Sequence, residues 1–250
     1  MNYTDKQIES LVKEWVCSKI DDKFEFREYQ LECIVRVIKN ILDHNYQNYI
    51  IEAPTGSGKS LINIISAGVL AEYFDLTSYI LCSDLFLWDQ YEKFLKKYTK
   101  TGIASIKGQT GNYECLLNGE DIRNADCRMA GLSWAALFNS ATIDKYGYDC
   151  AYRCPYVKAR KKAIKAKVCV MTYQLFLFIM NNPNYNKDAK GMPIFGQHNI
   201  LFCDECHNIP DIVQNQYSPT IVESHWDKLE SLYKGTTEQP TLFDNIIDND

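Results

Sequence analysis

The sequence lacks any apolar run long enough to cross a lipid bilayer, for which about 20 residues of helix are needed. Its longest apolar run, residues 168–180, is interrupted by Thr172, Tyr173 and Gln174. The chain begins Met-Asn-Tyr-Thr-Asp-Lys, without a basic segment followed by an apolar one, so no signal peptide is expected. These absences argue against a membrane partner and predict an intracellular, cytoplasmic protein, or a nuclear one in a eukaryotic cell.

A surplus of positive charge is also absent, because 27 basic and 32 acidic side chains give a net charge of −5. The overall charge therefore lends no support to nucleic-acid binding. One local basic run exists, and such a run either binds phosphate or forms a solvated helix face. It consists of Lys158, Arg160, Lys161, Lys162, Lys165 and Lys167.

Cysteine is plentiful, with 10 in the chain, but disulfides are not expected in a reducing compartment. Cysteines within apolar helix or strand patterns are expected to be small buried side chains. These are Cys33, Cys82, Cys169 and Cys203. A second group lies in an irregular segment and is able to hold a metal centre. This group consists of Cys115, Cys127, Cys150 and Cys154.

Apolar periodicity predicts helices alternating with strands, which indicates an α/β fold with a mostly parallel sheet covered on both faces. A helix is predicted to start at Thr4, where Gln7 completes a capping box. Further helices are predicted over residues 31–42, 59–74 and 85–98. Strands are predicted over residues 48–53, 78–83, 103–106, 168–173 and 199–203, and a loop over 181–198.

The alternation stops between residues 107 and 167, which predicts a small inserted subdomain that contains the second cysteine group. Residues 1–106 and 168–215 are then the two parts of the main domain. Residues 216–250 are expected to form a helical, acidic tail.

A glycine-rich loop follows the predicted strand at 48–53 and precedes a predicted helix, as phosphate binding requires. Gly56 and Gly58 allow the backbone to approach phosphate closely. Lys59 can place its ammonium on the β- and γ-phosphates, and Ser60 can offer its hydroxyl to Mg²⁺. The predicted phosphate-binding residues are Thr55, Gly56, Ser57, Gly58, Lys59 and Ser60.

The acidic segment Asp204-Glu205-Cys206-His207 follows an apolar strand, at the sheet edge where ligands bind in open α/β folds. Asp204 is expected to hold Mg²⁺, usually through water. Glu205 is expected to orient and deprotonate an attacking water. His207 is close enough in sequence to sense the γ-phosphate side or a neighbouring segment.

The glycine loop and the acidic segment together resemble those of superfamily 2 helicases and translocases. The resemblance implies a RecA-like domain that binds ATP and Mg²⁺. It also implies that Gln30 reads adenine, since an amide can bond both N6 and N7 of that base. An ordinary surface residue is the other interpretation of Gln30. Cys206 replaces the alanine that is commoner at this position.

The loose spacing of the second cysteine group leaves both a zinc site and an iron–sulfur cluster open. The flanking segments resemble the XPD and DinG group of iron–sulfur helicases over about residues 24–215. They are Ile106-Lys107-Gly108, Gly111-Asn112-Tyr113-Glu114-Cys115, Cys154-Pro155-Tyr156-Val157-Lys158-Ala159-Arg160, Ala166-Lys167-Val168-Cys169-Val170-Met171-Thr172-Tyr173 and Asp204-Glu205-Cys206-His207-Asn208-Ile209. The resemblance implies that Cys115, Cys127, Cys150 and Cys154 ligate one [4Fe–4S] cluster; a zinc site and four unliganded thiols are the alternatives.

The same resemblance implies single-stranded or forked DNA as the partner and 5′ to 3′ movement, with the cluster domain beside the DNA. The basic run would contact backbone phosphate. Tyr113, Trp134, Tyr152 and Tyr156 could stack on bases or pack the subdomain.

A superfamily 2 motor closes two RecA-like domains on ATP, and nothing after His207 resembles the second. We therefore expect the N-terminal half of a helicase, whose second domain lies in a downstream segment or a separate chain. Alone, the chain is expected to bind ATP weakly and not to unwind DNA. An RNA-directed ATPase of the same superfamily and a non-motor nucleic-acid-binding or regulatory protein are the alternatives.

Overall fold

The structure is a computed structural model that describes residues 3–43, 48–54, 56–109, 112–129, 145, 152–182, 186 and 193–218. The chain divides into two compact units, residues 1–212 and residues 213–250. Of the second unit, only residues 213–218 are described. None of the described helices combines the length and the apolar character of a membrane span.

Within the described residues, four strands form one parallel sheet in the order β2-β3-β1-β4. The strands are β1 (Ser78–Cys82), β2 (Ala104–Ser105), β3 (Val168–Thr172) and β4 (Ile200–Cys203). The central strands β1 and β3 are buried along their whole length. A continuously buried parallel strand is typical of a sheet covered on both faces, so the predicted α/β class is confirmed.

Helices connect these strands, and several begin where the sequence places a capping side chain. Thr4 and Gln7 form the predicted capping box at the start of α1. Asp84 and Thr172 accept main-chain N–H bonds at the starts of α4 and α8. The helices are α1 (Asp5–Lys19), α2 (Gln30–Leu42), α3 (Lys59–Tyr73), α4 (Leu85–Lys97), α5 (Asp126–Met129), α7 (Pro155–Lys165), α8 (Tyr173–Asn181) and α9 (Ile209–Tyr217). Short 3-10 turns occur at η1 (Thr99–Thr101), η2 (Ile122–Asn124) and η4 (Cys206–Asn208).

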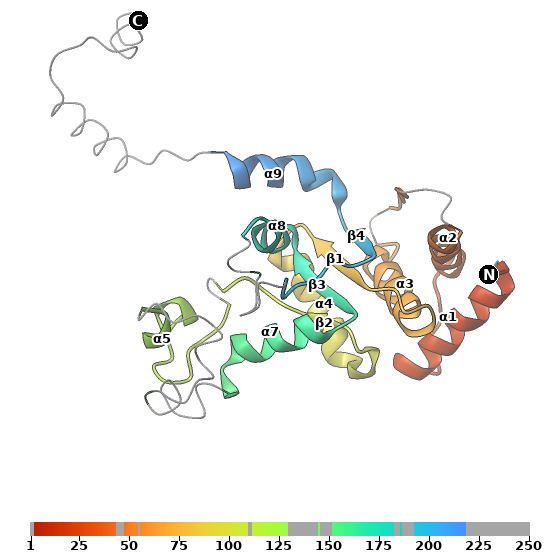
Figure 1. Cartoon of the computed structure of the whole chain (residues 1–250). Helices are drawn as coiled ribbons and strands as arrows, with labels where there is room; N and C mark the ends of the chain where they lie inside the picture. Colours follow the sequence, from red (N-terminus) through yellow and green to blue (C-terminus); the bar gives the residue numbers. More distant parts are fainter. Residues whose placement is uncertain are drawn as a thin grey trace, which may run out of the picture. The chain divides into compact units, whose positions relative to one another are not determined.

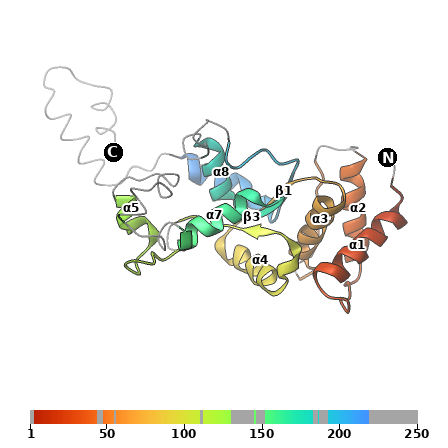
Figure 2. The ribbon, with the colours of Figure 1, turned by 60° about the horizontal axis from the view of Figure 1, so that its bottom comes forward.

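The sheet separates two apolar cores. On one face, Ile80 and Val170 pack with α1, α2, α3 and α4. On the other face, Tyr79 and Met171 pack with α7, α8 and the start of α9. Figure 1 shows α1, α2 and α3 lying side by side, and Figure 2 shows α4 and α8 on opposite sides of the strands. The alternation of side chains along β1 and β3 therefore supplies both layers.

The strand predicted at residues 48–53 is wrong. Residues 48–54 have no strand pairing, and Ile50 is 84% exposed. β4 consequently lies at the edge of the described sheet, and Leu201 on it is half-exposed. An apolar segment becomes a strand only when its main-chain groups pair with another strand, and residues 48–54 pair with none in the described structure.

Two smaller expectations also differ from the structure. Cys203 is exposed rather than buried, because it lies on the edge strand β4. Cys82 and Cys169 are buried as expected, and Cys33 is partly buried. The helix α8 was not predicted, since its apolar residues follow β3 without a break in the sequence pattern.

Candidate nucleotide and metal site

The glycine loop leads into the N-terminus of α3, which begins at Lys59. Gly56 and Gly58 have φ values of 83° and 85°, in the left-handed region that favours glycine. Main-chain N–H groups at a helix N-terminus have no partner within the helix and attract anions. The loop therefore has the local form that phosphate binding requires, although Thr55 lies outside the described residues.

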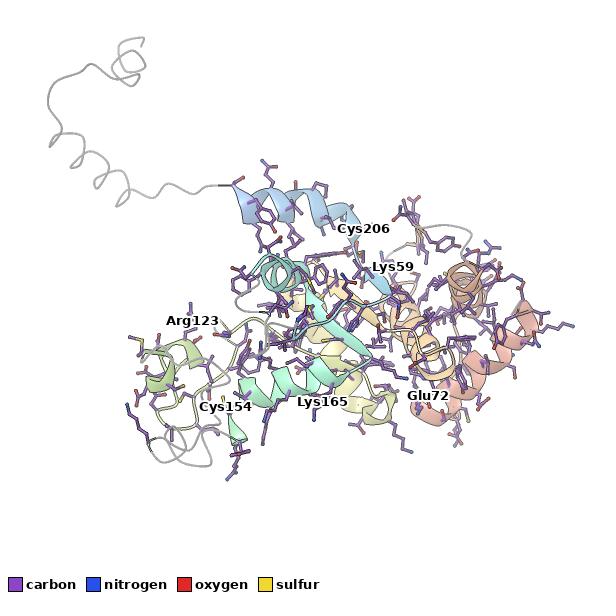
Figure 3. The ribbon with its side chains drawn as sticks, viewed as in Figure 1. Lys59, Glu72, Arg123, Cys154, Lys165 and Cys206 are labelled. Atoms are coloured by element: carbon purple, nitrogen blue, oxygen red, sulfur yellow. The ribbon has the colours of Figure 1, made fainter. Side chains whose placement is uncertain are left out.

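Side chains of this loop meet the acidic segment that follows β4. Lys59 Nζ lies 3.1 Å from Glu205 Oε1 and donates a second bond to the carbonyl of Ala53 at 3.4 Å. Ser60 Oγ donates to Asp204 Oδ2 at 3.2 Å. Figure 3 shows Lys59 close to the turn that carries Cys206. The structure thus brings together residues that are 144 positions apart in the sequence.

Ser60 and Asp204 offer a hydroxyl and a carboxylate side by side, and oxygen ligands of this kind are those that Mg²⁺ prefers. Asp204 is 4% exposed, so its charge is shielded from bulk water and available to a cation within the site. The donor set fits Mg²⁺. Ser60 and Asp204 would hold the ion, which would supply positive charge to offset that of the phosphate.

Two buried tyrosines hold Asp204, and the sequence pattern gave no indication of this role. Tyr91 on α4 donates to Asp204 Oδ2 at 2.7 Å, and Tyr173 donates to the main-chain carbonyl of Asp204 at 3.1 Å. Burial raises the pKa of both phenols above the ordinary value. Both hydroxyls therefore remain donors throughout the physiological pH range. The helical spacing of Trp88, Tyr91 and Leu95 predicts only a core position.

Glu205 has a φ of 52°, an uncommon backbone conformation for a residue with a side chain. Its carboxylate lies between Lys59 and His207, with His207 Nδ1 3.4 Å from Oε2. The imidazole of His207 is mostly exposed. His207 therefore contacts Glu205 directly.

Gln30 is 3% exposed, and both the oxygen and the nitrogen of its side-chain amide form hydrogen bonds with main-chain groups. Its Nε2 donates to the carbonyl of Ser57 at 2.9 Å, and its Oε1 accepts from the N–H of Arg27 at 2.9 Å. The surface-residue interpretation of Gln30 is therefore wrong. In this state the side chain ties the start of α2 to the glycine loop.

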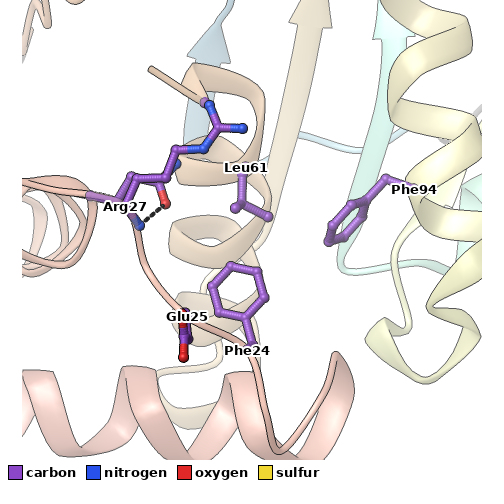
Figure 4. Close-up of a pocket in the computed structure, with 7 residues that line it drawn as sticks. Phe24, Glu25, Arg27, Leu61 and Phe94 are labelled. Carbon is purple, nitrogen blue, oxygen red and sulfur yellow. Dashed lines mark hydrogen bonds between the residues drawn. The ribbon is translucent and has the colours of Figure 1, made fainter. Parts of the chain in front are cut away.

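A pocket of about 350 Å³ lies beside Gln30 and Gly58. Figure 4 shows Phe24, Leu61 and Phe94 converging on it. Glu25 and Arg27 also line this pocket. The apolar wall of the pocket lies next to the glycine loop, so the pocket suits a flat aromatic group that carries a phosphate.

Three of the four candidate metal ligands lie in one apolar cluster. Cys115, Cys127 and Cys154 are 7%, 5% and 6% exposed, and Cys150 lies outside the described residues. Burial raises the pKa of Cys154, whereas N–H groups of Val157 and Tyr156 at the start of α7 act in the opposite direction. Buried sulfurs of this kind suit a thiophilic metal. No group of three or more ligating side chains is gathered among the described residues, so the metal site stays a prediction.

The basic run divides into two sets on α7 and just beyond it. Arg160 is buried with its guanidinium 5.7 Å from the ring centre of Phe195, and Lys167 pairs with Asp75 at 2.7 Å. The other four lysines are exposed and share one face of α7, with spacings of three and four residues. They are Lys158, Lys161, Lys162 and Lys165, here called the lysine face. Figure 3 marks Cys154 and Lys165 at the two ends of α7.

The four aromatic residues considered for base stacking have different environments. Tyr156 is fully buried, and its ring packs edge-on against that of Tyr113 with centres 5.2 Å apart. Tyr152 is 40% exposed and lies near Lys161, whose Nζ is 5.7 Å from the ring centre. Trp134 lies outside the described residues. Among those described, Tyr152 is thus the most exposed aromatic side chain of this set, and it lies beside the lysine face.

Residues 23–234 match the family model of the type III restriction enzyme res subunit. The chain belongs to this family. The match agrees with the predicted superfamily 2 type of domain, while the finer resemblance to iron–sulfur helicases stays a prediction.

Two helicases are similar to this chain. A probable ATP-dependent helicase of Methanocaldococcus jannaschii is 27% identical over 219 residues, which cover 78% of this chain and 31% of that protein. The ATP-dependent DNA helicase YoaA of Escherichia coli is 28% identical over 241 residues, which cover 79% of this chain and 35% of YoaA. The family member described here therefore spans about a third of the length of both relatives.

Proposed function

We propose that this chain is the ATP-binding domain of an ATP-dependent DNA helicase. The observation that carries the proposal is the direct contact of the glycine loop with the acidic segment, through Lys59 with Glu205 and Ser60 with Asp204. Lys59 would exchange Glu205 for the phosphates of ATP. Ser60 and Asp204 would hold Mg²⁺, and Glu205 would then be released to orient water.

The pocket beside Gln30 is proposed to receive the adenine ring, with Phe24 against the base. Gln30 would read the base after giving up its bond to Ser57. Equilibrium titration of the purified chain with a fluorescent ATP analogue tests this function, with GTP as competitor. Mg²⁺-dependent binding displaced by ATP in preference to GTP supports it. An absence of binding at millimolar nucleotide contradicts it.

Hydrolysis and unwinding are proposed to need a second RecA-like domain, supplied by another segment of the polypeptide or by a separate chain. The great length of both relatives compared with this chain supports that proposal. Fast DNA-stimulated hydrolysis by the purified 250 residues alone would count against it.

We further propose that Cys115, Cys127, Cys150 and Cys154 hold a [4Fe–4S] cluster, which would serve as a structural element beside the DNA. Cys154→Ser is expected to remove iron from anaerobically purified protein while nucleotide binding through Lys59 remains. Cys169→Ser is the matched control, since Cys169 is buried in the same apolar cluster but outside the proposed ligand set. Iron, sulfide and zinc analysis is the measurement. Stoichiometric zinc without iron would show a zinc site instead.

The lysine face is proposed to contact DNA phosphate. Replacing Lys158, Lys162 and Lys165 by glutamate is expected to weaken single-stranded DNA binding at least 10-fold and to flatten its salt dependence, since each phosphate contact releases counterions. Fluorescence anisotropy at several salt concentrations is the measurement. Nucleotide binding should not change.

The control for this experiment carries the same change in net charge on the opposite side of the sheet. It replaces Lys93, Lys96 and Lys97 of α4, which are exposed, by glutamate. Equal loss of DNA binding in both triple variants would show that overall charge is responsible, and that the lysine face has no particular role.

A further inference from the structure

Asp204 receives its shortest hydrogen bond from a residue outside both nucleotide motifs. The hydroxyl of Tyr91 donates to Oδ2 at 2.7 Å, whereas Ser60 donates to the same oxygen at 3.2 Å. Tyr91 is 1% exposed and Asp204 is 4% exposed. Water cannot easily replace a bond between two groups that are buried to this extent.

Asn63 fixes the direction of this bond. Its Nδ2 donates to the phenol oxygen of Tyr91 at 3.1 Å. A phenol has one proton, so an oxygen that accepts from Asn63 directs its proton to Asp204. Asn63 lies one turn after Ser60 on α3, and the two side chains therefore share a helix face. Burial, followed by the nearby charge of Asp204, raises the pKa of Tyr91 well above its ordinary value.

We infer that Tyr91 is a positioning residue for the proposed magnesium site, acting through Asp204. By holding Oδ2, it determines which carboxylate oxygen is turned toward the cation and prevents rotation of the carboxylate. Asn63 holds Tyr91 in the same way. The inference rests on the proposed binding of ATP with Mg²⁺.

The alternative is that Tyr91 only fills the apolar core, where its ring lies with Trp88 and Leu95. The substitution Tyr91→Phe separates the two roles, because it keeps the ring and removes the hydroxyl. Loss of a partner that orients a metal ligand typically weakens metal affinity about 10-fold to 100-fold. A core role predicts no change in the requirement for magnesium.

The experiment titrates Mg²⁺ into protein and a fluorescent ATP analogue after chelation of divalent ions. Tyr91→Phe is expected to raise the Mg²⁺ concentration at half-maximal effect about 10-fold. Nucleotide affinity without Mg²⁺ is expected to stay within about twofold, because the phosphate contacts of Lys59 do not involve Tyr91. A wild-type magnesium requirement in folded Tyr91→Phe overturns the inference.

Tyr79→Phe is the matched control. Tyr79 is 2% exposed, and its hydroxyl donates to the carbonyl of Gly196 at 3.0 Å, away from Asp204. It should bind Mg²⁺ and nucleotide as wild type does, and a similar magnesium defect in this variant would contradict a specific role for Tyr91. If Tyr91→Phe does not fold, Asn63→Ala tests the same network and must also weaken the response to Mg²⁺. Wild-type protein that binds no nucleotide contradicts the proposed function itself, whereas an unchanged Asn63→Ala overturns only the inference.

Discussion

Lys59→Ala is expected to weaken the binding of ATP with Mg²⁺ by about 100-fold, equivalent to about 3 kcal/mol. The lysine stands at the N-terminus of α3, and its ammonium now bonds Glu205 and the carbonyl of Ala53. A charge-assisted bond to phosphate contributes about 1.5 to 3 kcal/mol, and alanine can make none. Among the described side chains, Glu205 would then keep its contact with His207.

The measurement is titration with a fluorescent ATP analogue, accompanied by thermal unfolding. Lys19→Ala is a suitable control, since Lys19 pairs with Glu72 at 3.2 Å and is about as exposed as Lys59, but it lies on α1. We expect Lys19→Ala to bind nucleotide normally. Equal affinities of Lys59→Ala and wild type would refute the assignment of the glycine loop.

Gly68→Ala is expected to lower the free energy of unfolding by about 2 kcal/mol, although alanine favours helix over glycine by about 1 kcal/mol. A Cβ atom at position 68 would lie 2.1 Å from Cζ2 of Trp15, far inside the contact distance of two carbon atoms. Trp15 lies on α1, and its fully buried ring packs against α3 with little room to move. Overpacking of this kind costs about 3 kcal/mol, which exceeds the gain in helix propensity.

Urea unfolding monitored by circular dichroism gives this value directly. Trp15→Phe in the Gly68→Ala background should recover part of the loss, because the smaller ring vacates the position of the methyl group. Gly108→Ala, which meets no atom within 4 Å, should change stability by less than about 0.5 kcal/mol. An unaltered unfolding midpoint for Gly68→Ala would show that α1 and α3 can separate easily.

Much of the fold follows from local signals in the sequence. The capping box at Thr4 and the apolar spacing of Trp88 and Leu95 predicted helices that the structure contains. Residues 48–53 show the limit of such signals. Their apolar pattern is typical of a strand, yet strand formation depends on a neighbouring strand that a local pattern cannot reveal.

Some residues of the candidate site could likewise be identified from local sequence, and others could not. Lys59 and Glu205 could be named from sequence because phosphate and water chemistry restrict which residues occupy such segments. Tyr91 could not, since its bond to Asp204 joins residues 113 positions apart and its spacing on α4 indicates only burial. The exposed Cys203 and buried Arg160 likewise depend on tertiary neighbours that their own segments do not encode.

The position of β1 in the sheet has a consequence for biosynthesis. Ser78 of β1 pairs with Val168 and Ile200, which leave the ribosome long after it, whereas α1, α2 and α3 pack with near neighbours in sequence. Local contacts form early and distant strand pairings late. The helical N-terminal layer is therefore expected to form in the nascent chain before β1 can pair with β3 and β4. Asp204 and Glu205 directly follow β4, so their contacts with Lys59 and Ser60 can form only after β4 has been synthesised.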